Sequence, residues 1–321
     1  MKGRRHLPSD GREPQHSFTI LELLVAAAIT VLIAGLVLSL TSSALRNWSR
    51  SQGAFTADSQ ARLVLDRLAQ DFRGVLCRED GKVWLAATVQ SAVSVSGAWV
   101  NGTKPVTPSL NPAAANLVDA RFGVAGIWLR FFTLAQGADS RTNDPAAPIA
   151  VSYQLIRRSP TPSGENCHYL LYRAAITPSE TFAAGYDLSG SSYTTANDDD
   201  GAAGNVTRPG LRQVIADNVI DFGVHFFGYA PDLASGAPVL QRIFPVDGTD
   251  LDFRARSPST AGEAGMRFPA VADVLVRVLT DEGARQIAAL ESGQITGDWW
   301  AIAEADSKVF TRRILINAGS F

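Results

Sequence analysis

An uncharged apolar stretch near the N-terminus constrains this chain more than any other feature. Residues Leu23 to Leu40 carry no charged side chain, and a helix of about 20 apolar residues covers the ~30 Å hydrocarbon core of a bilayer. The preceding residues 1–17 are polar and hold four basic side chains against two acidic ones. Such an excess of Lys and Arg holds an N-terminus in the cytoplasm. The chain is therefore predicted to be a single-pass membrane protein, with everything after Leu40 outside the cytoplasm.

One acidic residue, Glu22, lies at the start of this apolar stretch. An ionisable side chain in a membrane helix costs of order 2.5–3.5 kcal/mol near the bilayer centre and less toward the ends, so it suggests a function. The alternative is a plain anchor in which Glu22 reaches the cytoplasmic headgroups. A cleaved secretory signal is disfavoured, because residues 41–50 follow without an Ala-x-Ala cleavage site.

Residues His16 to Ala26, with the sequence HSFTILELLVA, resemble the class III signal of type IV prepilins and of the pseudopilins of type II secretion. The resemblance implies that a prepilin peptidase cleaves between Ser17 and Phe18 and N-methylates Phe18. Glu22 would then be the fifth mature residue, which in this family pairs with the terminal amine of a neighbouring subunit in the filament. Two charges that are costly in lipid would neutralise each other and set the stagger of the helices.

The chain departs from the family pattern on both sides of the predicted cleavage point. Ser17 stands where the family nearly always has Gly, which leaves slow or absent processing open. The usual Leu-Ile order is reversed as Ile20-Leu21, a change that keeps the apolar volume.

The helix is expected to continue past the membrane, as a transmembrane part over residues 18–40 and a spine over residues 41–76. Apolar residues recur at helical spacing there, with charged residues largely between them, which predicts one face packed on a sheet and one solvated face. The apolar positions are Ala61, Leu65, Leu68, Phe72 and Val75, and the polar ones are Arg62, Asp66, Arg67, Asp71 and Arg73. The alternative is two separate helices with a break near residues 41–43.

Residues 77–321 are predicted to form an extracytoplasmic α+β head domain with a mostly antiparallel sheet. Short runs rich in β-forming residues are separated by Gly, Pro, Ser and Asn. The candidate strands are residues 82–89, 127–134, 149–157, 169–176, 219–229, 239–244, 271–279 and 309–316, and the candidate loops are 102–116, 136–148, 179–208 and 247–265. Residues 281–290 are predicted to be a helix, because Thr280 can cap its N-terminus.

The order of these elements resembles the J-type minor pseudopilins and the W-type minor pilins. A prepilin-like cassette protein of the Verrucomicrobia group is a related alternative. The K-type tip pseudopilin is disfavoured, because it usually lacks the Glu that stands here at position 22. The family implies four classes of partner: prepilin peptidase, other pilins or pseudopilins, an assembly platform in the inner membrane, and membrane lipid.

Charge gives no reason to expect nucleic-acid binding. The 29 basic residues face 31 acidic ones, for a net charge of -2, so no general attraction toward a polyanion exists. Two adjacent basic pairs, Arg157-Arg158 and Arg312-Arg313, are expected to be solvated, because neighbouring residues on a strand point to opposite faces.

The two cysteines, Cys77 and Cys167, both fall on the predicted exported side. An oxidising compartment permits a disulfide between them, which would close a loop of about 90 residues and contribute ~4 kcal/mol. Two unpaired cysteines are the alternative.

Calcium is the one ligand that the sequence suggests, because hard cations favour carboxylate-rich turns. Two loops offer such turns, the first with Asp198, Asp199 and Asp200, and the second with Asp247, Asp250 and Asp252. The alternative is that the carboxylates of both turns are solvated and bind no metal ion.

The sequence contains little that points to catalysis, and the chain is not expected to be an enzyme. Only His168 and His225 remain after the leader, and no metalloprotease, nucleophile-elbow or P-loop motif occurs. The function predicted is that of a structural minor subunit in a type IV pilus-like or type II secretion filament. The alternatives are a filament-tip adhesin and a permanently anchored extracytoplasmic domain.

Overall fold

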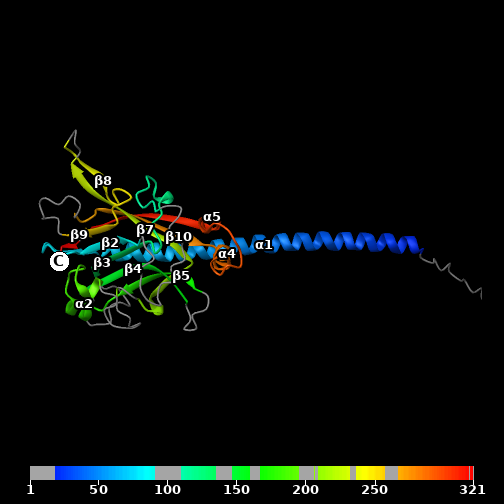
Figure 1. Cartoon of the computed structure of the whole chain (residues 1–321), viewed down its shortest axis with the longest axis horizontal. Coiled ribbons are helices and arrows are strands. Elements are labelled where there is room, and N and C mark those ends of the chain that lie inside the picture. The colour runs from blue at the N-terminus through cyan, green and yellow to red at the C-terminus, as the bar shows by residue number, and fades with distance from the viewer. Residues whose placement is uncertain are drawn as a thin grey trace, which may run out of the picture. The chain divides into compact units, whose positions relative to one another are not determined.

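A single helix, α1 (Ile20–Arg73), makes up the first part of the computed structural model (Figure 1). The structure describes residues 19–90, 110–134, 147–159, 167–194, 206, 209–231, 236–256, 267–317 and 319–320. These fall into two units, Met1–Ser51 and Gln52–Phe321. The second is called the head unit below, and it includes the C-terminal part of α1.

Two antiparallel sheets build the head unit. The six-stranded sheet has the order β6-β5-β4-β3-β2-β9, and the four-stranded sheet has the order β11-β10-β7-β8. The strands of the first are β2 (Leu85–Val89), β3 (Ile127–Leu134), β4 (Pro148–Arg158), β5 (His168–Ala175), β6 (Val214–Asp217) and β9 (Asp252–Ala255). Those of the second are β7 (Val219–Pro231), β8 (Pro238–Phe244), β10 (Val271–Leu279) and β11 (Ser307–Leu315).

Short elements complete the head unit. β1 (Leu76–Cys77) follows α1 and pairs in parallel with β12 (Gly319–Ser320) near the C-terminus. The remaining helices are α2 (Pro178–Ala184), α3 (Ser191–Thr194), α4 (Asp281–Glu291) and α5 (Trp299–Ala305), with 3-10 turns at η1 (Leu117–Asp119) and η3 (Leu211–Gln213).

The core lies where α1 meets the two sheets. Phe72 of α1 stacks on Phe131 of β3, with ring centroids 4.7 Å apart. Tyr153 of β4 contacts Phe222 of β7 across the sheets at 6.2 Å. Every second side chain of each strand points into this core, since successive side chains on a strand point to opposite faces.

The opposite face of the six-stranded sheet has its own smaller core. Phe132 meets Tyr193 of α3 edge to face, with ring centroids 5.7 Å apart, and Trp84 stacks on Tyr186 at 5.8 Å. Both faces of β3 are therefore largely covered, which explains why this strand is apolar at most of its positions.

The α+β class and the antiparallel pairing confirm the sequence prediction, and the bounds of β3 and β10 coincide with the predicted strands. Thr280 caps α4 by accepting a hydrogen bond from the Gly283 backbone N–H. The loops were predicted less well: α2, α3 and β9 form inside segments predicted to lack regular structure, and α5 was not predicted.

Candidate functional site

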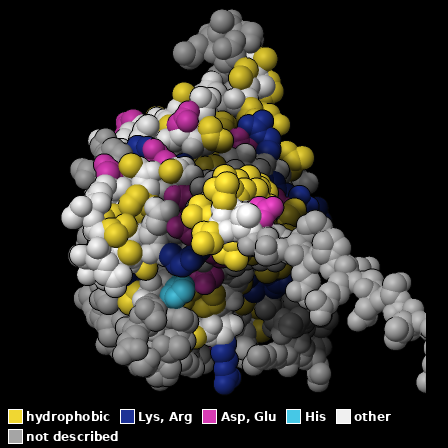
Figure 2. All heavy atoms as spheres, turned by 90° about the vertical axis from the view of Figure 1, so that its right-hand side faces the viewer, with side chains coloured by type: hydrophobic (Ala, Val, Ile, Leu, Met, Phe, Trp, Pro, Cys, Tyr) yellow, Lys and Arg dark blue, Asp and Glu magenta, His cyan; other side chains and the backbone are white. Residues whose placement is uncertain are grey.

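The first half of α1 presents an apolar surface. Residues Ile20–Leu45 form a 26-residue segment that contains an 18-residue window with a mean hydropathy of 2.8, and none of that window is buried in the structure. Figure 2 looks along α1 and shows hydrophobic side chains gathered around it. At 1.5 Å per residue the segment is about 39 Å long, enough for a ~30 Å hydrocarbon core. Among the residues that the structure describes, one helix is thus long and apolar enough to span a membrane.

Glu22 closes the first turn of this helix. The Glu22 Oε2 accepts hydrogen bonds from the backbone N–H and the hydroxyl of Thr19, each at 3.0 Å. The Glu22 backbone N–H in turn donates to the Thr19 hydroxyl at 3.3 Å. This reciprocal pattern is a capping box, in which two unpaired backbone donors at a helix start are satisfied together.

The capping box adds a local role that the sequence interpretation of Glu22 overlooked. The signal for it was present, because Thr19 and Glu22 have the spacing that a capping box requires. Both side chains remain exposed, so the carboxylate is accessible as well as partnered. The predicted cleavage and methylation residues, Ser17 and Phe18, lie outside the described residues.

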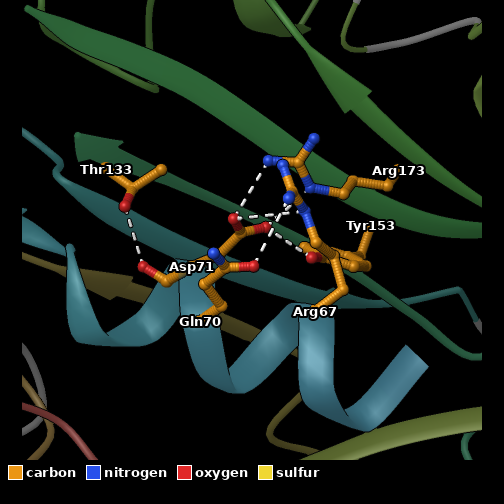
Figure 3. Close-up of polar contacts among 6 residues, drawn as sticks. All are labelled: Arg67, Gln70, Asp71, Thr133, Tyr153 and Arg173. Carbon is orange, nitrogen blue, oxygen red and sulfur yellow. Dashed lines mark hydrogen bonds and ion pairs between the residues drawn. The ribbon is translucent and has the colours of Figure 1, made fainter. Parts of the chain in front are cut away.

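At the other end of α1, Asp71 forms a buried ion pair with the six-stranded sheet (Figure 3). Its side chain is 2% exposed. Arg173 of β5 donates to both carboxylate oxygens, from Nε at 2.7 Å and from Nη2 at 3.0 Å. The hydroxyl of Tyr153 donates to Oδ2 at 2.5 Å, and Thr133 donates to the Asp71 backbone carbonyl at 2.8 Å. Side chains from three neighbouring strands therefore donate hydrogen bonds to Asp71 in the last turn of α1.

Charge and burial explain why these groups occur together. A buried carboxylate is tolerated when it is paired and hydrogen-bonded, and the fork of Arg173 matches it in a bidentate geometry. Arg67, one helical turn earlier, adds a second positive charge 3.8 Å from Asp71 Oδ1. Desolvation, followed by the charge of Asp71, raises the pKa of Tyr153 well above its ordinary value. Tyr153 therefore stays a neutral donor.

This cluster corrects the prediction that the polar face of the spine is solvated. Asp66 is exposed as expected, but Asp71 is buried. Helical periodicity could not separate the two, because the difference comes from Arg173, which is 102 positions away in the sequence. An arginine inside the otherwise apolar β5 was the available signal, since a buried cation needs an acidic partner.

Cys77 and Cys167 form no disulfide in the structure, in keeping with the alternative of two cysteines that are not bonded to each other. Val75 bridges to Thr133, which pairs with Ile149 at the start of β4, whereas His168 pairs with Arg158 at its end. The two cysteines thus lie near opposite ends of β4, whose ends are about nine residues, or ~30 Å, apart. A disulfide needs Cα atoms within about 7 Å.

The second acidic loop does not form a metal site in the structure. Within the described ranges, no three His, Cys, Asp or Glu side chains are grouped so as to hold a metal ion. Asp247 instead accepts hydrogen bonds from Thr249 and from the Asp250 backbone, and Asp252 pairs with Arg254. The first acidic turn, Asp198 to Asp200, lies outside the described residues.

Two of the predicted surface arginines form ion pairs, one largely buried and one exposed. Arg157 is 13% exposed and binds Glu291 at 2.6 Å, and Glu291 also accepts from the indole of Trp299. Arg312 pairs with Asp66 of α1. The expectation that both basic pairs are solvated is therefore wrong for Arg157, whereas the ion pair of Arg312 is exposed.

The two histidines lie on different sheets. His168 begins β5 and lies 3.4 Å from Asp217 at the rim of a cavity of about 840 Å³ beside α4. His225 lies in β7, where its ring nitrogen is 2.7 Å from the Pro112 carbonyl. The structure does not combine them into one site.

No family model, no curated protein and no solved structure matches this chain.

Proposed function

We propose that this chain is a minor subunit of a type IV pilus-like or type II secretion filament, held in the inner membrane before assembly. The observation that carries the proposal is that the two ends of α1 differ in charge and in burial. Its first half, Ile20–Leu45, is uncharged except for Glu22 and is exposed, whereas its last turns are buried in the head unit. One helix thus joins a lipid-compatible segment to a folded domain.

Glu22 has a defined chemical role in this proposal. Removal of the leader creates a positively charged amine at Phe18, and a neighbouring subunit would present it to the Glu22 carboxylate. Pairing removes the cost of two isolated charges in an apolar environment. The pairing is also specific, because Glu22 is the only charged residue between Phe18 and Leu45.

The buried ion pair at Asp71 supplies the mechanical link. A filament subunit is pulled through its helix, so the helix must not slide on its own head. Hydrogen bonds from β3, β4 and β5 to the last turn of α1 resist that movement. The proposed role of the head is to occupy a starting or terminal position in the filament.

The first experiment is the intact mass and N-terminal sequence of the protein extracted from its native membrane. The proposal expects a chain that starts at N-methylated Phe18. A Ser17→Gly variant should be processed more completely, because Gly is the residue that the peptidase family prefers. An unprocessed leader in both proteins would contradict filament assembly and favour a permanent anchor.

Assembly itself is tested by Glu22→Gln, with Ser39→Ala as the matched control in the same apolar segment. Both variants should insert and be processed. Only Glu22→Gln should be lost from sheared filament fractions, because the amide cannot neutralise the neighbouring amine. Equal recovery of the two variants in filaments would refute the assigned role of Glu22.

A further inference from the structure

One segment of the head unit lies on a sheet without joining it. Residues Leu110–Phe122, called the strap below, belong to the long connection between β2 and β3 (the blue-green segment beside β7 in Figure 1). Asn111 and Arg121 exchange two backbone hydrogen bonds of 3.1 Å, which close the strap on itself. In the described part of the chain, its backbone–backbone hydrogen bonds run within the strap, and none reaches β7, β8 or β10.

Side chains of the four-stranded sheet hold the strap by its backbone carbonyls. His225 of β7 lies 2.7 Å from the Pro112 carbonyl oxygen. Arg242 of β8 donates to the carbonyls of Ala114 and Ala113 at 2.7 and 3.0 Å, and Arg277 of β10 donates to the Val118 carbonyl at 3.3 Å. Three strands thus recognise main-chain atoms, as proteins that bind extended peptides do.

An aromatic anchor completes this recognition. Phe122 is fully buried and lies over Gly223 of β7, where a Cβ atom would come within 1.9 Å of the ring. The Phe122 ring also meets His225 edge to face at 5.8 Å. Gly223 therefore forms a notch that only a residue without a side chain can provide.

The face beneath the strap is mixed: charged side chains alternate there with apolar ones such as Leu275, which is fully buried and lies opposite Gly223. On β7 the residues facing the core are Ile220, Phe222, Val224 and Phe226, whereas the outer face carries Asp221 and His225. On β10 the outer face carries Asp273 and Arg277, which pair across the strands with His225 and Asp221. Antiparallel sheets commonly expose such a face to water, and the apolar cost of release is the exposure of Phe122 and Ala120, which the strap buries fully.

We propose that the outer face of the four-stranded sheet is a peptide-binding surface, that the strap is its tethered occupant, and that the strap can leave while both sheets stay folded. The ligand chemistry is a chain segment with accessible carbonyls, followed by an aromatic residue that enters the Gly223 notch. This inference does not depend on the proposed filament function.

Hydrogen–deuterium exchange of the full chain in detergent tests the release. The strap amides should exchange at least tenfold faster than those of β10, because local opening needs less free energy than global unfolding. Arg242→Ala should accelerate exchange of the strap alone, whereas the control Arg254→Ala on β9 should not change it. Exchange of the strap at the β10 rate, or equal acceleration of both regions by Arg242→Ala, would overturn the proposal.

A labelled peptide of residues 110–124 tests the recognition in trans. Phe122→Ala should loosen the tethered strap, so the peptide should bind this variant and not the unaltered chain. Adding Arg242→Ala to the Phe122→Ala chain should weaken peptide binding at least tenfold, since two hydrogen bonds from a charged group are lost. Arg254→Ala in the same background should have no effect. If the peptide does not bind a folded Phe122→Ala chain, or binds it without regard to Arg242, the surface is not a peptide site.

Discussion

At the scale of single residues, Asp71 decides how firmly α1 is attached to the head unit. Asp71→Ala would leave the side chain of Arg173, which is 7% exposed, buried without its counter-charge. Breaking one side of such a pair costs about 3–5 kcal/mol. We expect a loss of that size in the free energy of unfolding, measured with urea in detergent from the fluorescence of the buried tryptophans.

Asp66→Ala is the matched control, because Asp66 lies on the same helix and also pairs with an arginine, Arg312. Its side chain is 70% exposed, and an exposed ion pair is worth about 0–1 kcal/mol. Equal losses in the two variants would show that burial of the Asp71 pair adds nothing. Replacing both Asp71 and Arg173 with apolar residues should recover part of the loss, because no unpaired charge then remains buried.

His225 is expected to make stability depend on pH. Desolvation lowers the pKa of His225 below its ordinary value, while the Pro112 carbonyl and Asp273 oppose that shift and Arg242 reinforces it. The unfolded chain therefore binds the proton more readily than the folded one. The contribution to stability is present above a pH of about 6.5 and is lost as the pH falls below it.

The measurement is the urea midpoint between about pH 5 and pH 7.5. The unaltered chain should lose stability on acidification, and His225→Gln should lose less, because Gln can donate to the Pro112 carbonyl without titrating. The two proteins differ only at position 225, so the comparison isolates the contribution of that residue. Identical pH profiles would show that His225 does not titrate in this range.

At the scale of elements, the contact between β7 and the strap depends on Gly223. Gly223→Ala would place a methyl group 1.9 Å from the Phe122 ring, and overpacking of this kind costs about 1–3 kcal/mol. We expect lower stability together with faster amide exchange in the strap. Gly248→Ala is the control, because no atom lies within 4 Å of its Cβ position. Unchanged exchange in Gly223→Ala would mean that the ring does not occupy the notch.

Elements with their own periodicity could be predicted from the sequence, and elements made by distant partners could not. β3 and β10 are apolar runs bounded by turn residues, so their ends were predictable. β9 is a polar four-residue strand that forms because β2 offers it an edge, with Leu85 opposite Ala255. The strap has no periodicity, because its contacts come from side chains on three other strands.

The capping signals show the same distinction. Thr280 was recognised as the cap of α4, which follows a strand and carries a clear apolar face. The equivalent capping box of Thr177 and Glu180 at α2 was equally readable. It was missed because the seven-residue helix lies in a segment whose composition resembles a loop. The Thr177–Glu180 spacing is nevertheless a local signal that predicts a helix start.

At the scale of the whole molecule, the apolar segment and Glu22 could be predicted from the sequence, because membrane insertion is a property of one contiguous stretch. The Asp71 cluster could not, since it needs three strands and a helix to come together. The choice between a disulfide and two unbonded cysteines stayed open in the sequence for the same reason. Sequence separation says how large a loop is, whereas only the sheet registers show that its ends lie at opposite ends of β4.

A single charged substitution in the middle of the apolar segment should therefore be enough to weaken membrane attachment. Leu32→Asp places a carboxylate near the centre of Ile20–Leu45, where it costs about 2.5–3.5 kcal/mol. We expect the variant to be released from membranes by alkaline carbonate, whereas the unaltered chain remains in the pellet. The control is Leu315→Asp on β11, because Leu315 is 67% exposed and Leu32 is 69% exposed.

The comparison separates insertion from surface hydrophobicity. Both substitutions remove an exposed leucine and add one negative charge, so a chain held to membranes by general apolar contact should respond to both alike. A chain held by a spanning helix should respond only to Leu32→Asp, because water solvates the carboxylate at position 315 and lipid cannot solvate the one at position 32. Retention of Leu32→Asp in the pellet would mean that Ile20–Leu45 is not what anchors the protein.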